Sequence, residues 1–472
     1  AYHVQEILNL PSIGGKDSMS GTFNDIDVPP TLVSFAVDVV DVNKVISPEL
    51  KKADSNLIYI PLSRDSYDLP DFEELKKNYS KIHELITDGQ ILSAHTVGYG
   101  GLVEAISKMA MGNKIGVNIN DSITAENLYS RDYGSILIEI DGNIKYNEIL
   151  DGLNYIQIGN TTSETAIRYK NEVINIDEII DTWTNTLEDV YPTKTKETND
   201  VKDQLYKENK VYTCKNKIAR PKVFIPVFPG TNCEYDSAKA FEQAGADVDM
   251  FVFKNLTSKD IKESIKVMAD KINNSQMVMI PGGFSAGDEP EGSGKFIATV
   301  FRNEYIKNAV LELLQNRDGL MLGICNGFQS LIKLGLVPYG DIRELTNDDP
   351  TLTYNTIGRH ISCMVNTKII SNKSPWLANV NVGDIHSIPV SHGEGRFIVN
   401  EAIAKKLFDN GQVATQYVDF EGNPTMDIRF NPNGSLYAIE GITSPDGRIL
   451  GKMGHSERIG TNVAKNIIGK KD

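Results

Sequence analysis

The chain has 472 residues, a length typical of two or three domains with sizeable hydrophobic cores. Hydrophobic residues make up 40% and charged residues 24%, which excludes wholesale disorder, and every apolar run is too short to span a membrane. The net charge of −15 argues against general binding to nucleic acid or to an anionic membrane. The four cysteines form no C-x-x-C pair, so we expect no disulfide framework and a reducing, cytoplasmic location.

The first part of the chain mixes strand and helix patterns without regular alternation, which predicts an α+β fold. Short apolar runs indicate strands, and longer amphipathic stretches indicate helices. In chain order we expect strands over Leu32–Val42 and Leu57–Pro61, helices over Asp71–Asp88 and Leu102–Met111, and strands over Ile136–Ile140 and Tyr155–Ile158. The chain opens at Ala1 without an initiator methionine, which we interpret as a fragment of a longer polypeptide.

Residues 193–220 are rich in Lys, Glu, Thr and Asn, and we interpret them as a linker, or as an exposed helix followed by a linker. The segments after it alternate between strand and helix, which predicts a parallel sheet covered on both faces. We expect strands over Val223–Phe228, Val248–Phe253, Met277–Ile280 and Leu320–Ile324, and helices over Glu234–Ala244, from Thr257 or Ser258 to about Ile272, and over Ile306–Leu314. Ligands of such a sheet bind outside the carboxyl ends of its strands.

The strongest local signal is the run from Leu320 to Gln329, in which a buried strand leads through Gly-x-Cys325-x-Gly into a helix. This is the pattern of a nucleophile elbow, whose flanking glycines relieve crowding between strand and helix. A cysteine at a helix N-terminus is favoured as the thiolate. The backbone N–H of Asn326 would face an oxyanion. The Gly-Gly283-Phe284 turn after the preceding strand could add a second donor.

A thiolate nucleophile also needs a base, and two histidines are candidates. His455 and His392 each have a glutamate two residues further on, Glu457 and Glu394. Side chains at positions i and i+2 of an extended segment share one face, so either glutamate could orient its histidine. The spacing alone therefore leaves two triads open.

Five motifs in the same order resemble the class I glutamine amidotransferase domain of the phosphoribosylformylglycinamidine synthase family. They are Pro-Gly230-Thr-Asn-Cys233, Pro-Gly-Gly283-Phe284, Gly-Ile-Cys325-Asn-Gly-Phe-Gln329, Ser-His392-Gly-Glu-Gly-Arg396 and Gly-His455-Ser-Glu457-Arg458. The resemblance implies a flavodoxin-like parallel α/β domain with Cys325, His455 and Glu457 as its triad. It also implies that Gly283, Phe284, Asn326 and Gln329 form the oxyanion hole and contact glutamine.

The segment Gly-Gly-Lys16-Asp17-Ser18-Met resembles the second synthetase half of the same family, which is similar to aminoimidazole ribonucleotide synthetase. This likeness implies that Lys16, Asp17 and Ser18 contact nucleotide or phosphate. Many family members have an Asp and a Ser that contact Mg²⁺ and ATP where this chain has Thr96 and Gly98. Because threonine supplies no carboxylate, we assign no metal ligand: either nucleotide binds differently in this chain, or another carboxylate serves.

The resemblance divides the chain into four segments and implies one reaction. The segments are the end of a synthetase-like N-domain (residues 1–45), a synthetase-like C-domain (46–192), the linker (193–220) and the amidotransferase domain (221–472). We expect a C-terminal fragment of the ligase. In the complete enzyme it would hydrolyse glutamine and supply ammonia for the ATP- and Mg²⁺-dependent conversion of formylglycinamide ribonucleotide to the amidine, whereas the fragment alone would be at most a glutaminase. Its partner would be the N-terminal half of the same polypeptide. The alternatives are a stand-alone cysteine hydrolase or peptidase and a non-catalytic scaffold.

Overall fold

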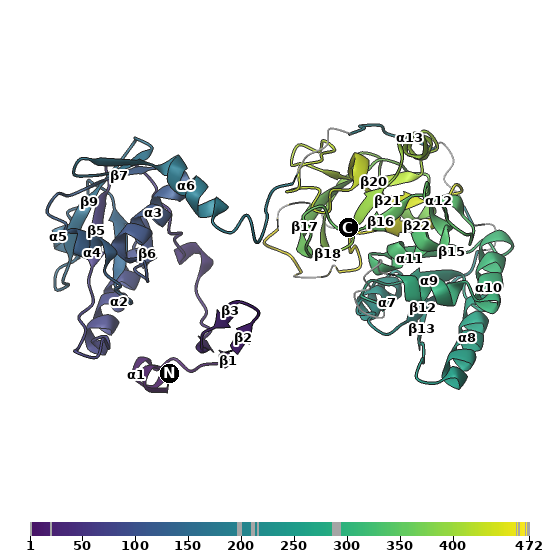
Figure 1. The fold of residues 1–472 in the computed structure, drawn as a ribbon, viewed down its shortest axis with the longest axis horizontal. Helices are drawn as coiled ribbons and strands as arrows, with labels where there is room; N and C mark the ends of the chain where they lie inside the picture. The colour runs from purple at the N-terminus through teal and green to yellow at the C-terminus, as the bar shows by residue number, and fades with distance from the viewer. Residues whose placement is uncertain are drawn as a thin grey trace. The chain divides into compact units, whose positions relative to one another are not determined.

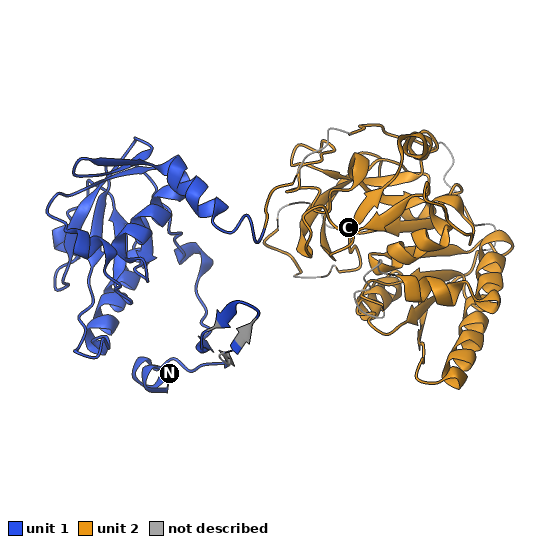
Figure 2. Ribbon diagram, in the orientation of Figure 1, with its two compact units in different colours: residues 1–191 blue, residues 192–472 orange. Residues whose placement is uncertain are grey.

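The computed structural model folds into two compact units, residues 1–191 and 192–472, which are described separately (Figures 1 and 2). It describes residues 2–18, 21–195, 201–208, 213–214, 217–285, 294–458, 460, 463–467 and 469, without the side chains of residues 16–18, 22, 23 and 28. The predicted roles of Lys16, Asp17 and Ser18 therefore fall outside the described side chains. Within the described ranges, no helix combines the length and the apolar character that crossing a membrane requires.

The first unit is built on a seven-stranded, largely antiparallel sheet of order β11-β10-β7-β9-β5-β8-β6, with two short strand pairs before it. Its strands are β1 (Gly14–Ser18), β2 (Gly21–Phe23), β3 (Ile26–Val28), β4 (Thr31–Phe35), β5 (Asn56–Ile60), β6 (Ser93–Thr96), β7 (Gly116–Ile119), β8 (Ile136–Ile140), β9 (Ile156–Thr162), β10 (Ala166–Tyr169) and β11 (Glu172–Asn175). Its helices are α1 (Tyr2–Leu8), α2 (Phe72–Thr87), α3 (Gly101–Asn113), α4 (Ala125–Tyr129), α5 (Tyr146–Ile149) and α6 (Ile176–Asn185).

Local sequence signals account for most of these boundaries. Helix α2 begins after Asp71, whose carboxylate accepts hydrogen bonds from two backbone N–H groups of the first turn. The expected strand over Leu32–Val42 is too long, because β4 ends at Phe35. Its partner β1 has only five residues, so the valines further along find no strand to pair with and are exposed. The Gly-Gly-Lys16 segment is itself part of strand β1.

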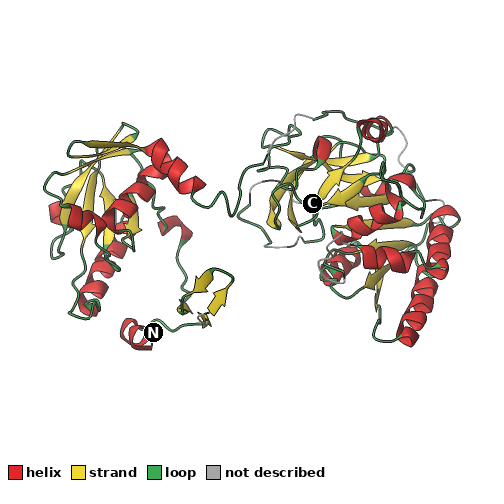
Figure 3. Cartoon of the chain, in the orientation of Figure 1, coloured by secondary structure: helices red, strands yellow, loops and turns green. Residues whose placement is uncertain are grey.

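The second unit is built on a nine-stranded mixed sheet of order β13-β12-β14-β15-β22-β21-β20-β17-β18, with a small β16-β19 pair beside it (Figure 3). Its strands are β12 (Lys222–Val227), β13 (Asp247–Val252), β14 (Met277–Ile280), β15 (Leu320–Ile324), β16 (Thr351–Thr353), β17 (Ile361–Ile369), β18 (Ile385–His392), β19 (Arg396–Ile398), β20 (Val413–Val418), β21 (Ile439–Thr443) and β22 (Ile449–Lys452). Its helices are α7 (Glu234–Gln243), α8 (Ser258–Asn273), α9 (Lys295–Phe301), α10 (Glu304–Gln315), α11 (Asn326–Leu334), α12 (Leu336–Tyr339) and α13 (Glu401–Asp409).

The first five strands of this order run parallel, and the rest are antiparallel. The parallel part is the α/β arrangement that the sequence predicts, and the antiparallel extension is an addition to it. The helices and strands enclose one large hydrophobic core with fully buried residues such as Phe224, Phe301 and Phe328. Because β12, β14, β15 and β22 are parallel, their carboxyl ends meet at one edge of the sheet.

Part of the predicted linker packs onto the second unit. Tyr206 forms a parallel bridge with Ser371, and its N–H donates to the carbonyl of Ile370 at 2.8 Å. The N–H of Glu208 donates to the side chain of Asn372 at 2.7 Å. This stretch thus adds backbone hydrogen bonds to the domain it precedes.

Candidate active site

Cys325 occupies a strained turn between β15 and α11. Its φ of 52° and ψ of −106° are unusual for a residue with a side chain. The strain is held from both sides, since its N–H donates to the carbonyl of Lys452 at 2.8 Å and its carbonyl accepts from the first turn of α11. Such a backbone presents the side chain outward from the end of the strand, as in a nucleophile elbow.

The two glycines of the elbow are required by close backbone contacts. A Cβ on Gly323 would lie 2.7 Å from the backbone of Gly327, and a Cβ on Gly327 would collide with the carbonyl of Ile280. The strand, the turn and the helix can therefore pack this tightly only with glycine at both positions. The sequence pattern predicts this crowding, and the structure shows which backbone atoms cause it.

His455 and Glu457 lie just beyond β22 and form a buried pair. The Nδ1 of His455 is 2.7 Å from Oε1 of Glu457, and the two side chains are 3% and 4% exposed. The N–H of His455 also donates to the carbonyl of Pro389 at 2.9 Å, which fixes the loop. Burial lowers the pKa of His455, but hydrogen bonds with Cys233, Cys325 and Glu457 outweigh it and raise the pKa to about 12.

The other candidate base, His392, has a different environment. Its Nδ1 lies 3.3 Å from the side-chain oxygen of Asn355, which belongs to an amide and not to a carboxylate. Burial, with the nearby His360 and His455 adding to it, lowers the pKa of His392 to about 3. A neutral amide neighbour cannot stabilise an imidazolium as Glu457 can. The chemistry of a proton acceptor therefore fits His455.

The predicted oxyanion donors differ in how they are engaged. The N–H of Phe284 donates to the carbonyl of Gly230 at 2.8 Å, so it is occupied. Gly283 pairs with Thr231 in an isolated antiparallel bridge. The hydrogen bonds of this bridge are made by the residues on either side of the pair, so the bridge does not use the N–H of Gly283. Asn326 begins α11, where a backbone N–H has no intrahelical partner. The predicted oxyanion role of the Gly283 and Asn326 N–H groups therefore stays a prediction, whereas the N–H of Phe284 is engaged elsewhere.

Gln329 is buried in a network that joins α11 to the loop after β18. Its amide oxygen accepts from the side chain of Asn326 at 2.9 Å, and its amide N–H donates to the carbonyl of Glu394 at 2.6 Å. These contacts position the elbow helix. The predicted contact of Gln329 with bound glutamine remains a prediction.

One residue at this edge received no role from the sequence. Cys233, beyond the end of β12, is 1% exposed, and its sulfur lies 3.8 Å from Nδ1 of His455. The guanidinium of Arg458 donates to the same sulfur at 3.1 Å. The sequence did offer one indication. Cys233 follows a predicted parallel strand, and such strands end at the same sheet edge as the strand before Cys325.

Among the described side chains of the first unit, no group of potential metal ligands is comparable. In the described parts of the chain, the only group of three potential metal ligands is Cys233, His455 and Glu457. Thr96 ends β6 on the surface, and the nearby Glu104 is engaged by the N–H of Gly100 at 2.7 Å and by Lys108. These residues offer no carboxylate set for Mg²⁺, which prefers several oxygen ligands. We therefore derive no step through this metal.

A strained cysteine beside a buried His–Glu pair at one sheet edge is the arrangement expected of a cysteine-dependent enzyme. Comparison with known proteins specifies the class further. Residues 220–472 match the family described as the CobB/CobQ-like glutamine amidotransferase domain.

Individual relatives agree with this family. The subunit PurQ of phosphoribosylformylglycinamidine synthase from Methanococcus maripaludis is 38% identical over 241 residues, which are 50% of this chain and 82% of that protein. A probable phosphoribosylformylglycinamidine synthase of Arabidopsis thaliana, described as chloroplastic/mitochondrial, is 26% identical over 96% of this chain and 35% of its own length. A chain in the structure of PurLQS from Thermotoga maritima covers 51% of this chain and 89% of its own length, with 26% identity and a TM-score of 0.37. This chain belongs to the phosphoribosylformylglycinamidine synthase family, and its second unit carries the glutamine amidotransferase domain.

Proposed function

We propose that the second unit hydrolyses glutamine through a thioester on Cys325. The observation that carries this proposal is that the strained turn of Cys325 and the buried His455–Glu457 pair meet at one sheet edge, where a Cβ on Gly282 would lie 2.7 Å from the ring of His455 and 3.4 Å from Cβ of Cys325. The thiolate attacks the side-chain amide carbon of glutamine, and the N–H groups of Gly283 and Asn326 stabilise the oxyanion. His455 then gives its proton to the leaving nitrogen, the C–N bond breaks, and ammonia departs.

The second half of the cycle regenerates the enzyme. Water attacks the thioester while His455 accepts its proton, and the C–S bond breaks to release glutamate. Glu457 acts throughout by holding the Nδ1 proton of His455 and by balancing the charge of the imidazolium. Burial of both side chains excludes bulk water, which strengthens this interaction.

We infer that the ammonia serves an ATP-dependent synthetase reaction to which the first unit contributes. ATP would phosphorylate the formylglycinamide oxygen of the ribonucleotide, and ammonia would displace phosphate to leave the amidine. The Arabidopsis relative supports this link, since it aligns with both units in a single chain. We assign no residue of the first unit to that chemistry.

The test is labelling by an electrophilic glutamine analogue, read by peptide mass spectrometry. We expect one label per chain on Cys325 and protection by glutamine. The exposed Cys363 should stay unlabelled and provides the internal control. Labelling that glutamine does not prevent, together with cleavage of peptides, would instead favour a peptidase with the same elbow. No labelling of Cys325 and no turnover would favour a scaffold.

A further inference from the structure

A second cysteine contacts the proposed base from its Nδ1 side. The sulfur of Cys233 lies 3.8 Å from Nδ1 of His455, and Oε1 of Glu457 lies 2.7 Å from the same nitrogen. One ligand atom from each of the three residues falls within 4.8 Å of the others, and all three residues are buried. The hydrolysis proposed above assigns no role to Cys233, so this sulfur requires a separate explanation.

The carboxylate of Glu457 supplies a second, independent observation. Its other oxygen, Oε2, is buried and has no hydrogen-bond partner among the described residues. The side chain is only 4% exposed, so water contributes little to satisfying this oxygen. A buried carboxylate oxygen is expected to find a donor or a cation.

We propose that a thiophilic divalent transition-metal ion, with Zn²⁺ as the reference, binds to Cys233 Sγ, His455 Nδ1 and the carboxylate of Glu457. Tetrahedral zinc with bonds of about 2.3 Å to sulfur and about 2.0 Å to nitrogen separates these two ligand atoms by about 3.6 Å. The sulfur and the nitrogen are already 3.8 Å apart. Glu457 has to turn away from its hydrogen bond to His455 so that either oxygen reaches the ion, and the thiol of Cys233 has to give up its hydrogen bond to the side-chain oxygen of Asn232, 3.0 Å away.

The set of ligand atoms also selects the kind of metal. Thiolate and imidazole favour zinc and similar ions over Mg²⁺ and Ca²⁺, which prefer oxygen. An ionised Cys233 and an ionised Glu457 together balance a charge of +2. The positive guanidinium of Arg458 repels the ion. The carboxylate of Asp236 lies 3.6 Å from Nε of Arg458 and offsets part of the guanidinium charge.

The bound ion inhibits glutamine hydrolysis, a consequence that rests on the proposed function. The metal takes the lone pair of Nδ1, so the imidazole proton is fixed on Nε2. The ring can then no longer accept a proton from water or from the thiol of Cys325. It also loses the hydrogen bond by which Glu457 orients it. Metal binding and hydrolysis are therefore mutually exclusive.

The experiment uses the full chain in metal-free buffer. Isothermal titration with Zn²⁺ should show one ion per chain. Co²⁺ should give the near-ultraviolet charge-transfer band of a thiolate ligand and the visible bands of a tetrahedral site. Glutaminase activity should fall in proportion to occupancy and return with a chelator. Cys233→Ser should weaken binding by more than roughly 100-fold, since loss of even an outer-shell partner typically costs 10- to 100-fold.

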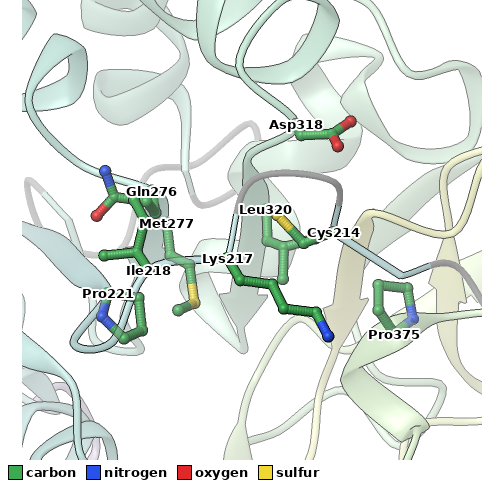
Figure 4. Close-up of a pocket in the computed structure, with 9 residues that line it drawn as sticks. All are labelled: Cys214, Lys217, Ile218, Pro221, Gln276, Met277, Asp318, Leu320 and Pro375. Atoms are coloured by element: carbon green, nitrogen blue, oxygen red, sulfur yellow. The ribbon is translucent and has the colours of Figure 1, made fainter.

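Two variants serve as controls. Cys214→Ser removes an exposed cysteine that lines a separate cavity of about 360 Å³ (Figure 4), and it should bind the ion like the wild type. That cavity includes Gln276 and Leu320, at the strand ends opposite to Cys325. Cys325→Ala should also keep the ion and the thiolate band, because the nucleophile is outside the proposed ligand set.

Each result decides the matter. Absence of a thiolate band in the wild-type chain overturns the inference without requiring any variant to fold. Unchanged affinity in Cys233→Ser, or a band that disappears in Cys325→Ala, also overturns it. A chain that binds the ion through Cys233 but shows no glutaminase activity when metal-free keeps the metal site and refutes the proposed function.

Discussion

The loops that follow the strands are placed differently in the two units, because neighbouring strands are parallel in the central part of one sheet and mostly antiparallel in the other. In the second unit β12, β14, β15 and β22 are parallel, so the segments after them meet at one edge and bring together Cys233, Gly282, Cys325 and His455. The sheet of the first unit is mostly antiparallel, and its neighbouring strands end at opposite edges. Parallel strands gather distant residues into one buried site, whereas antiparallel strands distribute them. Five predictions test this contrast.

The largest expected effect comes from removing the nucleophile. Cys325→Ala should lower glutaminase turnover by roughly 10⁴-fold or more, because it removes the thiol that forms the proposed thioester. Ammonia release at saturating glutamine is the measurement. Cys363→Ala, on an exposed cysteine of the same unit, is the matched control and should retain activity. Turnover in Cys325→Ala that equals the control would contradict the assignment.

Replacing the proposed base, His455, should reduce glutaminase turnover more than replacing its partner, Glu457. His455→Asn should reduce turnover by roughly 10⁴-fold, and Glu457→Gln by roughly 100-fold or more, because the orienting charge is lost while the side-chain shape remains. The matched control is His83→Asn, on the surface of the first unit. A greater loss in His392→Asn than in His455→Asn would transfer the role of base to His392.

Crowding the meeting point of the loops should have an intermediate effect. A Cβ on Gly282 would lie 2.7 Å from the ring of His455, 3.1 Å from the sulfur of Cys233 and 3.4 Å from Cβ of Cys325. Gly282→Ala should therefore shift the ring and lower kcat by roughly 100-fold, the usual cost of a displacement of about 1 Å. Gly393→Ala adds the same methyl group in open space, and equal kinetics in the two variants would show that this crowding has no effect.

His392 should make the second unit sensitive to acid. Its folded-state pKa of about 3 lies below the ordinary 6.5, so the unfolded chain binds the extra proton between these values. The contribution of His392 to stability is therefore nearly complete above pH 6.5 and decreases as the pH falls toward 3, by about 2 kcal/mol between pH 7 and 5. Urea unfolding followed by Trp376 fluorescence in a Trp183→Phe background measures this loss. His392→Gln should reduce the loss by that amount, and an identical pH dependence would contradict the prediction.

The smallest effect is expected in the first unit. Thr96 is exposed at the end of β6, so Thr96→Val should change glutaminase kcat/KM by less than roughly twofold. The same assay used for Cys325→Ala measures it, with the wild-type chain as reference. A loss of tenfold or more would show that this surface acts on glutamine hydrolysis and would break the contrast between the units.

Local features of the molecule followed from the sequence alone. The strands over Met277–Ile280 and Leu320–Ile324 have the predicted bounds, and the elbow at Cys325 has the strained turn that its glycines indicate. Helix α8 begins after Thr257, one of its two predicted caps. These features depend on neighbours in the chain, namely on apolar periodicity, capping side chains and glycine at crowded positions.

Contacts between distant segments were decided only by the tertiary structure. Sequence spacing alone could not decide between His392 and His455 as the base. In the fold, His392 contacts the amide of Asn355, and His455 contacts the carboxylate of Glu457. The sulfur of Cys233 lies 3.8 Å from Nδ1 of His455, which is more than 200 residues away in the sequence. No residue near Cys233 in the sequence predicts this contact. The reason is physical: the order and direction of strands set these contacts, and strand order depends on how the whole core packs rather than on any single segment.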